Sequence, residues 1–118
     1  MGYYRERTVR VIEYTRPDGR SPFGRWFESL DAQAAAKIAT ALSRIEEGNT
    51  SRLKWFRGIG ECVIDWGPGY RVYLAKEGEG SILLFGGGTK RTQFEDIRRA
   101  TALHQEYRER RRAESGGA

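Results

Sequence analysis

The sequence has few of the residues that disulfide-linked and metal-binding proteins require. Its 118 residues include a single cysteine, Cys62, and a single histidine, His104. One cysteine excludes a disulfide framework, and without HxxxH or CxxC spacing we expect no zinc site built by the protein. Cys62 alternates with apolar neighbours in a strand pattern, so a small buried core residue is the first interpretation and a nucleophile the alternative. We expect neither a metal nor another cofactor.

Long apolar runs are also missing. No stretch approaches the length of a membrane span, and the first residues lack the apolar core of a signal peptide. The sequence therefore predicts a cytoplasmic protein with no membrane partner. Lys and Arg number 21 against 16 Asp and Glu, and this net charge of +5 suits a polyanion or an acidic protein partner without demanding either.

Turn residues and apolar periodicity predict one α+β domain over residues 1–112, followed by a flexible tail at 113–118. We expect the order β-α-α-β-β-β-α, in which two N-terminal helices pack on one face of a small, antiparallel-rich sheet and a helix ends the domain. The last three strands should form a meander. The expected elements are a strand at 8–15, helices capped by Ser21 (with Pro22 first) and Asp31, strands at 61–66, 70–76 and 81–86, and a helix opened by a Thr92–Glu95 capping box.

Cationic side chains gather among glycines where the predicted strands end. A three-residue loop at 67–69 would place Asp65 opposite Arg71 in a hairpin, so Arg71 either forms that ion pair or binds a phosphate. Lys90 and Arg91 follow three glycines and precede a helix, whose free amides and dipole attract anions. This pattern predicts a phosphate site, with a solvated strand-to-helix turn as the alternative.

A second basic group has aromatic neighbours. Lys54 and Arg57 flank Trp55 and Phe56, a combination that suits single-stranded RNA because its bases stack on aromatic rings. The alternative is that the two aromatic residues form the inner face of a strand. His104 lies on the apolar side of the last predicted helix, where a packed histidine at the edge of the core is the first interpretation and a general base the second.

Two strings carry a family resemblance. Gly-Pro-Gly-Tyr-Arg-Val-Tyr at 67–73 and Leu-Leu-Phe-Gly-Gly-Gly-Thr-Lys-Arg-Thr-Gln-Phe-Glu-Asp-Ile at 83–97, in the element order above, resemble the RelE/ParE toxin superfamily. Within it, the chain is similar to the phage-derived, HigB-like addiction module killer proteins. The resemblance covers about residues 11–102, with weaker support at 18–26. It implies a RelE-like fold and the toxin of a type II toxin-antitoxin system, which inhibits translation as a ribosome-dependent mRNA interferase.

The resemblance also implies a chemistry and partners. In RelE-like endoribonucleases a ribose 2′-oxygen attacks the adjacent phosphate without a metal, and cationic side chains stabilise the developing charge. The implied partners are mRNA, the ribosome and a cognate antitoxin, commonly a helix-turn-helix protein. The residues assigned on this basis are Arg71, Lys90 and Arg91 for catalysis, Lys54, Arg57 and Tyr73 for RNA binding, and His104 for possible proton transfer.

Departures from the family pattern keep other functions open. Thr89 stands where relatives often carry an acid, and Ile97 stands where RelE itself places a tyrosine. Proton transfer would then fall to Lys90, Tyr73, His104 or the ribosome, since arginine is a poor base. Two alternatives follow: a ParE-type toxin that inhibits DNA gyrase without nuclease activity, and a degenerate module that binds antitoxin only.

Overall fold

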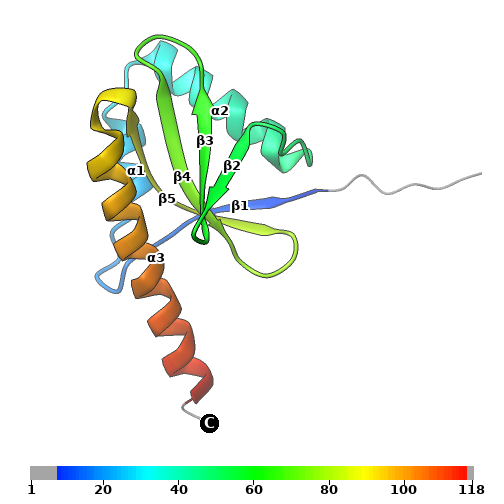
Figure 1. Ribbon diagram of the computed structural model, residues 1–118, viewed down its shortest axis with the longest axis vertical. Helices are drawn as coiled ribbons and strands as arrows, with labels where there is room; N and C mark the ends of the chain where they lie inside the picture. Colours follow the sequence, from blue (N-terminus) through cyan, green and yellow to red (C-terminus); the bar gives the residue numbers. More distant parts are fainter. Residues whose placement is uncertain (1–7, 117–118) are drawn as a thin grey trace, which may run out of the picture.

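The computed structural model describes residues 8–116 as an α+β fold built on one five-stranded sheet (Figure 1). The strands lie in the order β1-β5-β4-β3-β2; β1 pairs with β5 in parallel and the other pairs are antiparallel. The expected meander is confirmed, with β2 as an additional strand at its edge. The elements are β1 Arg10–Glu13, α1 Pro22–Glu28, α2 Ala32–Glu46, β2 Leu53–Phe56, β3 Ile59–Ile64, β4 Tyr70–Lys76, β5 Ser81–Thr89, a 3-10 turn Lys90–Thr92 and α3 Gln93–Gly116.

The two N-terminal helices begin at the capping residues that the sequence indicated. The Ser21 hydroxyl accepts a hydrogen bond from the Gly24 N–H at 3.0 Å, and Pro22 occupies the first turn of α1. The Asp31 carboxylate accepts from the Ala34 N–H at 2.8 Å and caps α2. Each cap satisfies an N–H that has no partner within its helix, so both predicted starts are confirmed.

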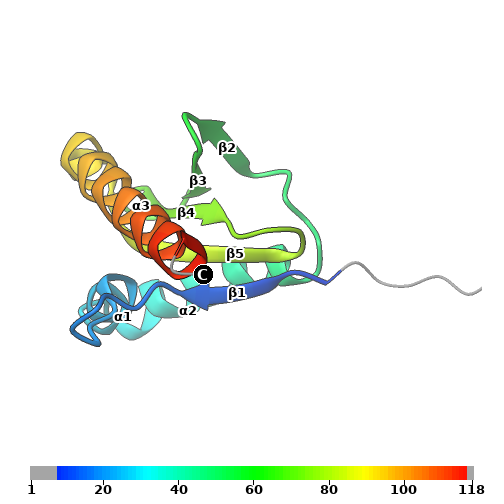
Figure 2. The same ribbon diagram turned by 90° about the horizontal axis from the view of Figure 1, so that it is seen from below.

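Helices cover both faces of the sheet. Figure 2 shows α1 and α2 on one side and α3 on the other. Alternation along the strands therefore builds two apolar layers, because neighbouring side chains point to opposite faces. The layer under α1 and α2 contains Phe23, Ile38, Ile45, Cys62, Ile64, Val72, Leu74, Ile82 and Leu84, and the layer under α3 contains Tyr14, Ile59, Tyr73, Ala75, Leu83, Phe85 and Ala100.

The hairpin between β3 and β4 differs from the expected register by two residues. Ile64 pairs with Tyr70, and Val63 rather than Asp65 pairs with Arg71. The connection is residues 65–69, longer than the expected three-residue loop. Because side chains alternate with a period of two, this slip keeps every residue on its predicted face while changing its neighbours.

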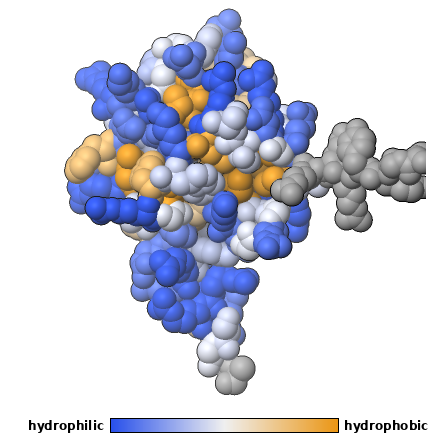
Figure 3. Space-filling view, turned by 45° about the vertical axis from the view of Figure 1, so that its right-hand side comes forward, coloured by the Kyte–Doolittle hydropathy of each residue, from blue (hydrophilic) through white to orange (hydrophobic). Residues whose placement is uncertain are grey.

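The C-terminal helix departs from expectation at both ends. Thr92 belongs to the 3-10 turn, and its hydroxyl donates to the Asp96 carboxylate, so the predicted capping box with Glu95 does not form. The helix continues to Gly116, into the segment expected to be a flexible tail. Its last turns project beyond the sheet and carry hydrophilic side chains (Figures 1 and 3). Residues 1–7 and 117–118, which the sequence analysis placed in the domain and the tail, lie outside the described residues.

Among residues 8–116, no helix combines the length and apolar character needed to cross a membrane.

Candidate functional site

Arg71 is held in place on the face of the sheet that α3 covers. Its Nη1 donates to the Gly69 carbonyl at 2.9 Å, and its Nε lies 3.3 Å from Glu61 Oε2. The Nε–H is not aligned on that oxygen, so the contact is an ion pair rather than a hydrogen bond. The expected pairing of Arg71 with Asp65 is therefore wrong, because the two-residue slip brings Glu61 into reach instead.

Glu61, the ion-pair partner of Arg71, is a buried carboxylate. Only 4% of the residue is exposed, and Gln93 Nε2 donates to Glu61 Oε2 at 2.7 Å. Lys54 lies directly opposite Glu61 in the β2–β3 pair and is exposed. Cross-strand neighbours on one face have Cβ atoms about 5 Å apart, so Lys54 belongs to the same surface as Arg71.

The Arg71 guanidinium and the base of the Lys90 side chain both lie beside Gly69. A Cβ atom on Gly69 would lie 3.4 Å from Arg71 Nη1 and 3.7 Å from Lys90 Cβ. Gly69 also has φ +78°, a conformation that other residues rarely adopt. Lys90 and Arg91 are both exposed in the 3-10 turn that follows β5. Lys90 and Arg91 have no ion-pair partner among residues 8–116, whereas the Arg71 guanidinium is held by Gly69 and Glu61. These three residues form the cationic cluster.

Tyr73 lies beneath this cluster and not at its surface. It is 0% exposed, and its hydroxyl has no hydrogen-bond partner among the described residues. Burial, followed by the negative charges of Glu61 and Asp96, raises the pKa of Tyr73, so the phenol stays protonated. The expected contact of Tyr73 with RNA is not available in this arrangement, because no base can reach its ring.

His104 and Arg57 lie at the other end of β3. A Cβ atom on Gly58 would be 3.5 Å from His104 Cε1, and the His104 ring packs against Phe85 with 5.6 Å between centroids. Burial, with a smaller contribution from Arg108, lowers the pKa of His104. Gly58 is five residues from Val63, the cross-strand neighbour of Arg71, which corresponds to about 17 Å of strand. The packed-histidine interpretation fits this position, and the proposed proton-transfer role does not.

The three glycines before Lys90 belong to a strand, and two of them serve packing. They lie inside β5, opposite β4. A Cβ atom on Gly87 would collide with the Trp26 ring, and one on Gly88 would collide with the Asp96 carboxylate. Gly87 and Gly88 thus make room for side chains from the two covering layers, whereas a Cβ atom on Gly86 would meet nothing within 4 Å. The predicted phosphate site therefore depends on Lys90 and Arg91, which are exposed, and not on the glycines before them.

The start of α3 already carries its own negative charge. Glu95 and Asp96 occupy its first turn, where a carboxylate interacts favourably with the helix dipole. Asp96 is 9% exposed, accepts from Thr92 and lies 3.8 Å from Arg99 Nη1. An incoming phosphate would therefore be attracted by the side chains of this end of the sheet rather than by free helix amides.

Sequence reasoning missed the two buried acids and Gln93. The sequence does contain a signal for Glu61. It is the one acid in the segment Ile59–Ile64, and the alternation of side chains puts it on the same face of the sheet as Arg71. A charged residue in such a position is almost always paired. Among residues 8–116, no group of three or more His, Cys, Asp and Glu side chains is arranged to hold a metal ion.

These features define a small α+β protein with a cationic cluster at one end of its sheet, anchored on a buried glutamate. No family model matches the chain. An uncharacterized protein of Haemophilus influenzae (strain ATCC 51907 / DSM 11121 / KW20 / Rd) is 41% identical over 86 residues, which span 71% of this chain and 87% of that protein. The chain belongs to the same family as this H. influenzae protein.

Proposed function

We propose that the chain is the toxin of a type II toxin-antitoxin pair and acts as a ribosome-dependent mRNA endoribonuclease. One observation carries the proposal: the Arg71 guanidinium and the base of the Lys90 side chain both lie beside Gly69, with Arg91 exposed in the same turn. These are the cations that match the basic positions of RelE-like toxins. The proposal places the protein in the cytoplasm, with mRNA and the ribosome as targets and a helix-turn-helix antitoxin as inhibitor.

In the proposed reaction, a ribose 2′-oxygen attacks the adjacent phosphorus and the bond to the 5′-oxygen of the next nucleotide breaks. The products are a 2′,3′-cyclic phosphate and a 5′-hydroxyl, which takes up one proton as the 2′-hydroxyl loses one. Arg71 and Lys90 stabilise the charge that develops on the phosphate oxygens. Donors fixed before the reaction are worth roughly 3–4 kcal/mol each in such sites. Glu61 and the Gly69 carbonyl supply that fixation for Arg71.

Proton transfer falls to Lys90 or to a group that the ribosome supplies. Tyr73 is buried and its raised pKa keeps it protonated, and His104 is separated from Arg71 by most of the length of β3. Lys54 lies on the same face as the cluster and is exposed, so we assign it to the flanking RNA. Arg57 lies in the turn between β2 and β3, so it would contact RNA only if the bound RNA extends along the sheet.

Primer extension on messages from cells induced to express the protein tests the proposal. We expect new 5′ ends within translated regions, absent in Arg71→Ala and in Lys90→Ala. Lys90 is exposed, so Lys90→Ala leaves the fold intact even if removing Arg71 destabilises it. Arg112→Ala, a matched exposed cation at the far end of α3, should cleave like the parent.

Two results would contradict the nuclease proposal. Growth arrest with intact messages would instead favour a toxin of the ParE class, and gyrase supercoiling assays would follow. Unimpaired growth at every expression level, with the protein folded and soluble in the same cells, would favour a module that has kept only antitoxin binding.

A further inference from the structure

Two buried side-chain polar atoms in the described range 8–116 lack a hydrogen-bond partner, and both belong to residues around Glu61. They are Arg71 Nε, which lies 3.3 Å from Glu61 Oε2 without pointing at it, and the Tyr73 hydroxyl. Burying an unpartnered hydroxyl is unfavourable, because the group loses its hydrogen bonds to water and gains none in exchange. Nearly all buried polar groups in proteins are therefore satisfied, and an exception calls for an explanation.

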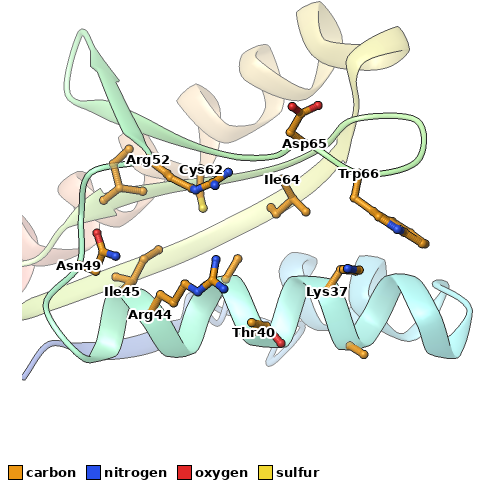
Figure 4. Close-up of a pocket in the computed structure, with 13 residues that line it drawn as sticks. Lys37, Thr40, Arg44, Ile45, Asn49, Arg52, Cys62, Ile64, Asp65 and Trp66 are labelled. Carbon is orange, nitrogen blue, oxygen red and sulfur yellow. The ribbon is translucent and has the colours of Figure 1, made fainter.

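Tyr73 and Glu61 are neighbours on one face of the sheet. They pair across β4 and β3, so their side chains point the same way, with Cβ atoms about 5 Å apart. Figure 4 shows the alternation along β3 from the α2 side: Cys62 and Ile64 point toward α2, and Asp65 points away from it. Glu61 precedes Cys62 and so faces the α3 side, where the Tyr73 ring is packed.

The Tyr73 hydroxyl lies within the influence of two carboxylates. Burial is the main cause of its raised pKa, and the negative charges of Glu61 and Asp96 raise the pKa further, so the phenol keeps a proton to donate. Asp96 already accepts from the Thr92 hydroxyl, and Glu61 Oε2 accepts from Gln93 Nε2. A carboxylate has two oxygens and about four acceptor positions, so Glu61 can accept from a second donor.

Glu61 compensates the charge of Arg71 in the free protein. A guanidinium holds a phosphate best through two parallel N–H groups, and its side-on edge uses Nε–H. In Arg71 this Nε is buried, while Nη1 donates to the Gly69 carbonyl. A side-on contact with a phosphate therefore needs the guanidinium to turn outward. That movement would leave the buried Glu61 carboxylate without its counter-ion, which is strongly unfavourable.

We propose that Tyr73 is a positioning residue: when Arg71 turns to a bound RNA phosphate, the Tyr73 hydroxyl donates to Glu61 in its place. The buried carboxylate then keeps a second donor in both states, and the hydroxyl that has no partner in the free protein gains one in the complex. The inference rests on the proposed function, since it needs the cationic cluster to bind RNA. It does not depend on which group transfers the proton.

The test compares the parent with Tyr73→Phe, which removes one hydroxyl and nothing else. The probe is a short 2′-O-methyl RNA, which has phosphates but no free 2′-hydroxyl and is therefore not cleaved. Fluorescence anisotropy of the labelled RNA gives Kd. Because hydrogen bonds to charged groups are the stronger ones, Tyr73→Phe should raise Kd by roughly tenfold. Because the hydroxyl has no partner in the free protein, the variant should unfold at the same urea concentration as the parent or at a higher one.

Tyr107→Phe is the matched control. Tyr107 packs against the same apolar layer under α3, and its hydroxyl donates to Glu77 at 3.0 Å. Its removal should lower the urea midpoint, because a hydrogen bond of the free protein is lost, and should leave Kd within about twofold of the parent value. A merely structural role for Tyr73 would give the same pattern as Tyr107. Opposite changes in the two variants therefore separate positioning from packing.

Two further measurements test the route through Glu61. In a Glu61→Gln background the buried charge is absent, so adding Tyr73→Phe should change Kd by less than about twofold. In the parent, the RNA should shift the NMR signals of Arg71 ¹⁵Nε and Tyr73 ¹³Cζ together, because one group leaves Glu61 as the other approaches it. In Glu61→Gln the Tyr73 signal should stay where it is in the free protein.

Four outcomes would overturn the inference. The first is a Tyr73→Phe variant that unfolds at lower urea than the parent, which would mean that the hydroxyl is already satisfied in the free protein, as by a bound water. The second is an unchanged Kd, and the third is equal weakening by Tyr73→Phe with and without Glu61. The fourth is a parent that does not bind the RNA at millimolar concentration, since Arg71 would then have no phosphate to turn to. Message cleavage in cells is scored separately by primer extension, so the nuclease proposal stands or fails on its own result.

Discussion

Replacing Glu61 with glutamine tests whether the cationic cluster depends on a buried charge. Glutamine has the same shape and can still accept the hydrogen bond from Gln93 Nε2, so the change removes only the negative charge beside Arg71. Breaking a buried ion pair by removing one partner costs about 3–5 kcal/mol. The Arg71 side chain keeps 13% exposure and its bond to the Gly69 carbonyl, which places the expected loss at the lower end, about 3 kcal/mol.

Urea unfolding with an unchanged m-value measures this loss, and thermal unfolding should show Tm lower by roughly 12–20 °C. The matched control is Glu95→Gln. Glu95 also pairs with an arginine, Arg98, at 3.1 Å, but 56% and 66% of the two side chains are exposed. An exposed pair of this kind contributes about 0.5 kcal/mol or less. The two substitutions change the same chemical group at a buried and an exposed site; Glu95 also lies in the first turn of α3, where its interaction with the helix dipole adds about 0.3–1 kcal/mol.

A double-mutant cycle separates the pair from its surroundings. Arg71→Met leaves Glu61 as the uncompensated charge, whereas Arg71→Met combined with Glu61→Gln leaves neither. We therefore expect the double variant to be more stable than the sum of the two single losses predicts, by about 2 kcal/mol. Additive losses, or a Glu61→Gln variant as stable as Glu95→Gln, would refute the reasoning that Glu61 fixes Arg71.

Three further predictions concern other parts of the molecule. Gly87→Ala forces a Cβ atom into the Trp26 ring and should lower the free energy of unfolding by about 1–3 kcal/mol in urea titrations. The hydrogen bond and charge of Arg16 lower the pKa of Glu106, so this pair stabilises the fold above the ordinary carboxyl pKa of 4.5. That contribution disappears as pH falls through the lowered value, and the stability difference between the parent and Glu106→Gln should shrink over the same range. Burial lowers the pKa of His104, so its ring protons should titrate in NMR with a midpoint below 6.5, and His104→Gln should leave message cleavage unchanged.

Local signals in the sequence predicted the parts of the fold that local interactions determine. Ser21 and Asp31 cap helices because each side chain accepts a hydrogen bond from the free backbone N–H three residues later. The residue types and their position before the apolar stripe are visible in the sequence alone. Alternation of apolar residues likewise predicts that Cys62, Ile64, Val72 and Leu74 share one face of the sheet, as they do.

The register of the β3–β4 hairpin could not be predicted, because it depends on the length of a loop. A three-residue and a five-residue connection leave the same apolar faces buried and differ by two positions of pairing. Choosing between them requires the contacts of Arg71: with the shorter loop it meets the exposed Asp65, and with the longer one it meets the buried Glu61. The ion-pair partner of Arg71 is therefore determined by tertiary packing and not by the local sequence.

Phe94 shows the same limit on α3. Its i, i+3 spacing from Ile97 predicts a buried side of the helix, yet Phe94 is 74% exposed. The 3-10 turn Lys90–Thr92 ahead of the helix sets which residues of the first turn face the sheet, and Asp96 and Ala100 are the buried ones. A periodicity argument fixes the spacing of a stripe and leaves its rotation about the helix axis to packing.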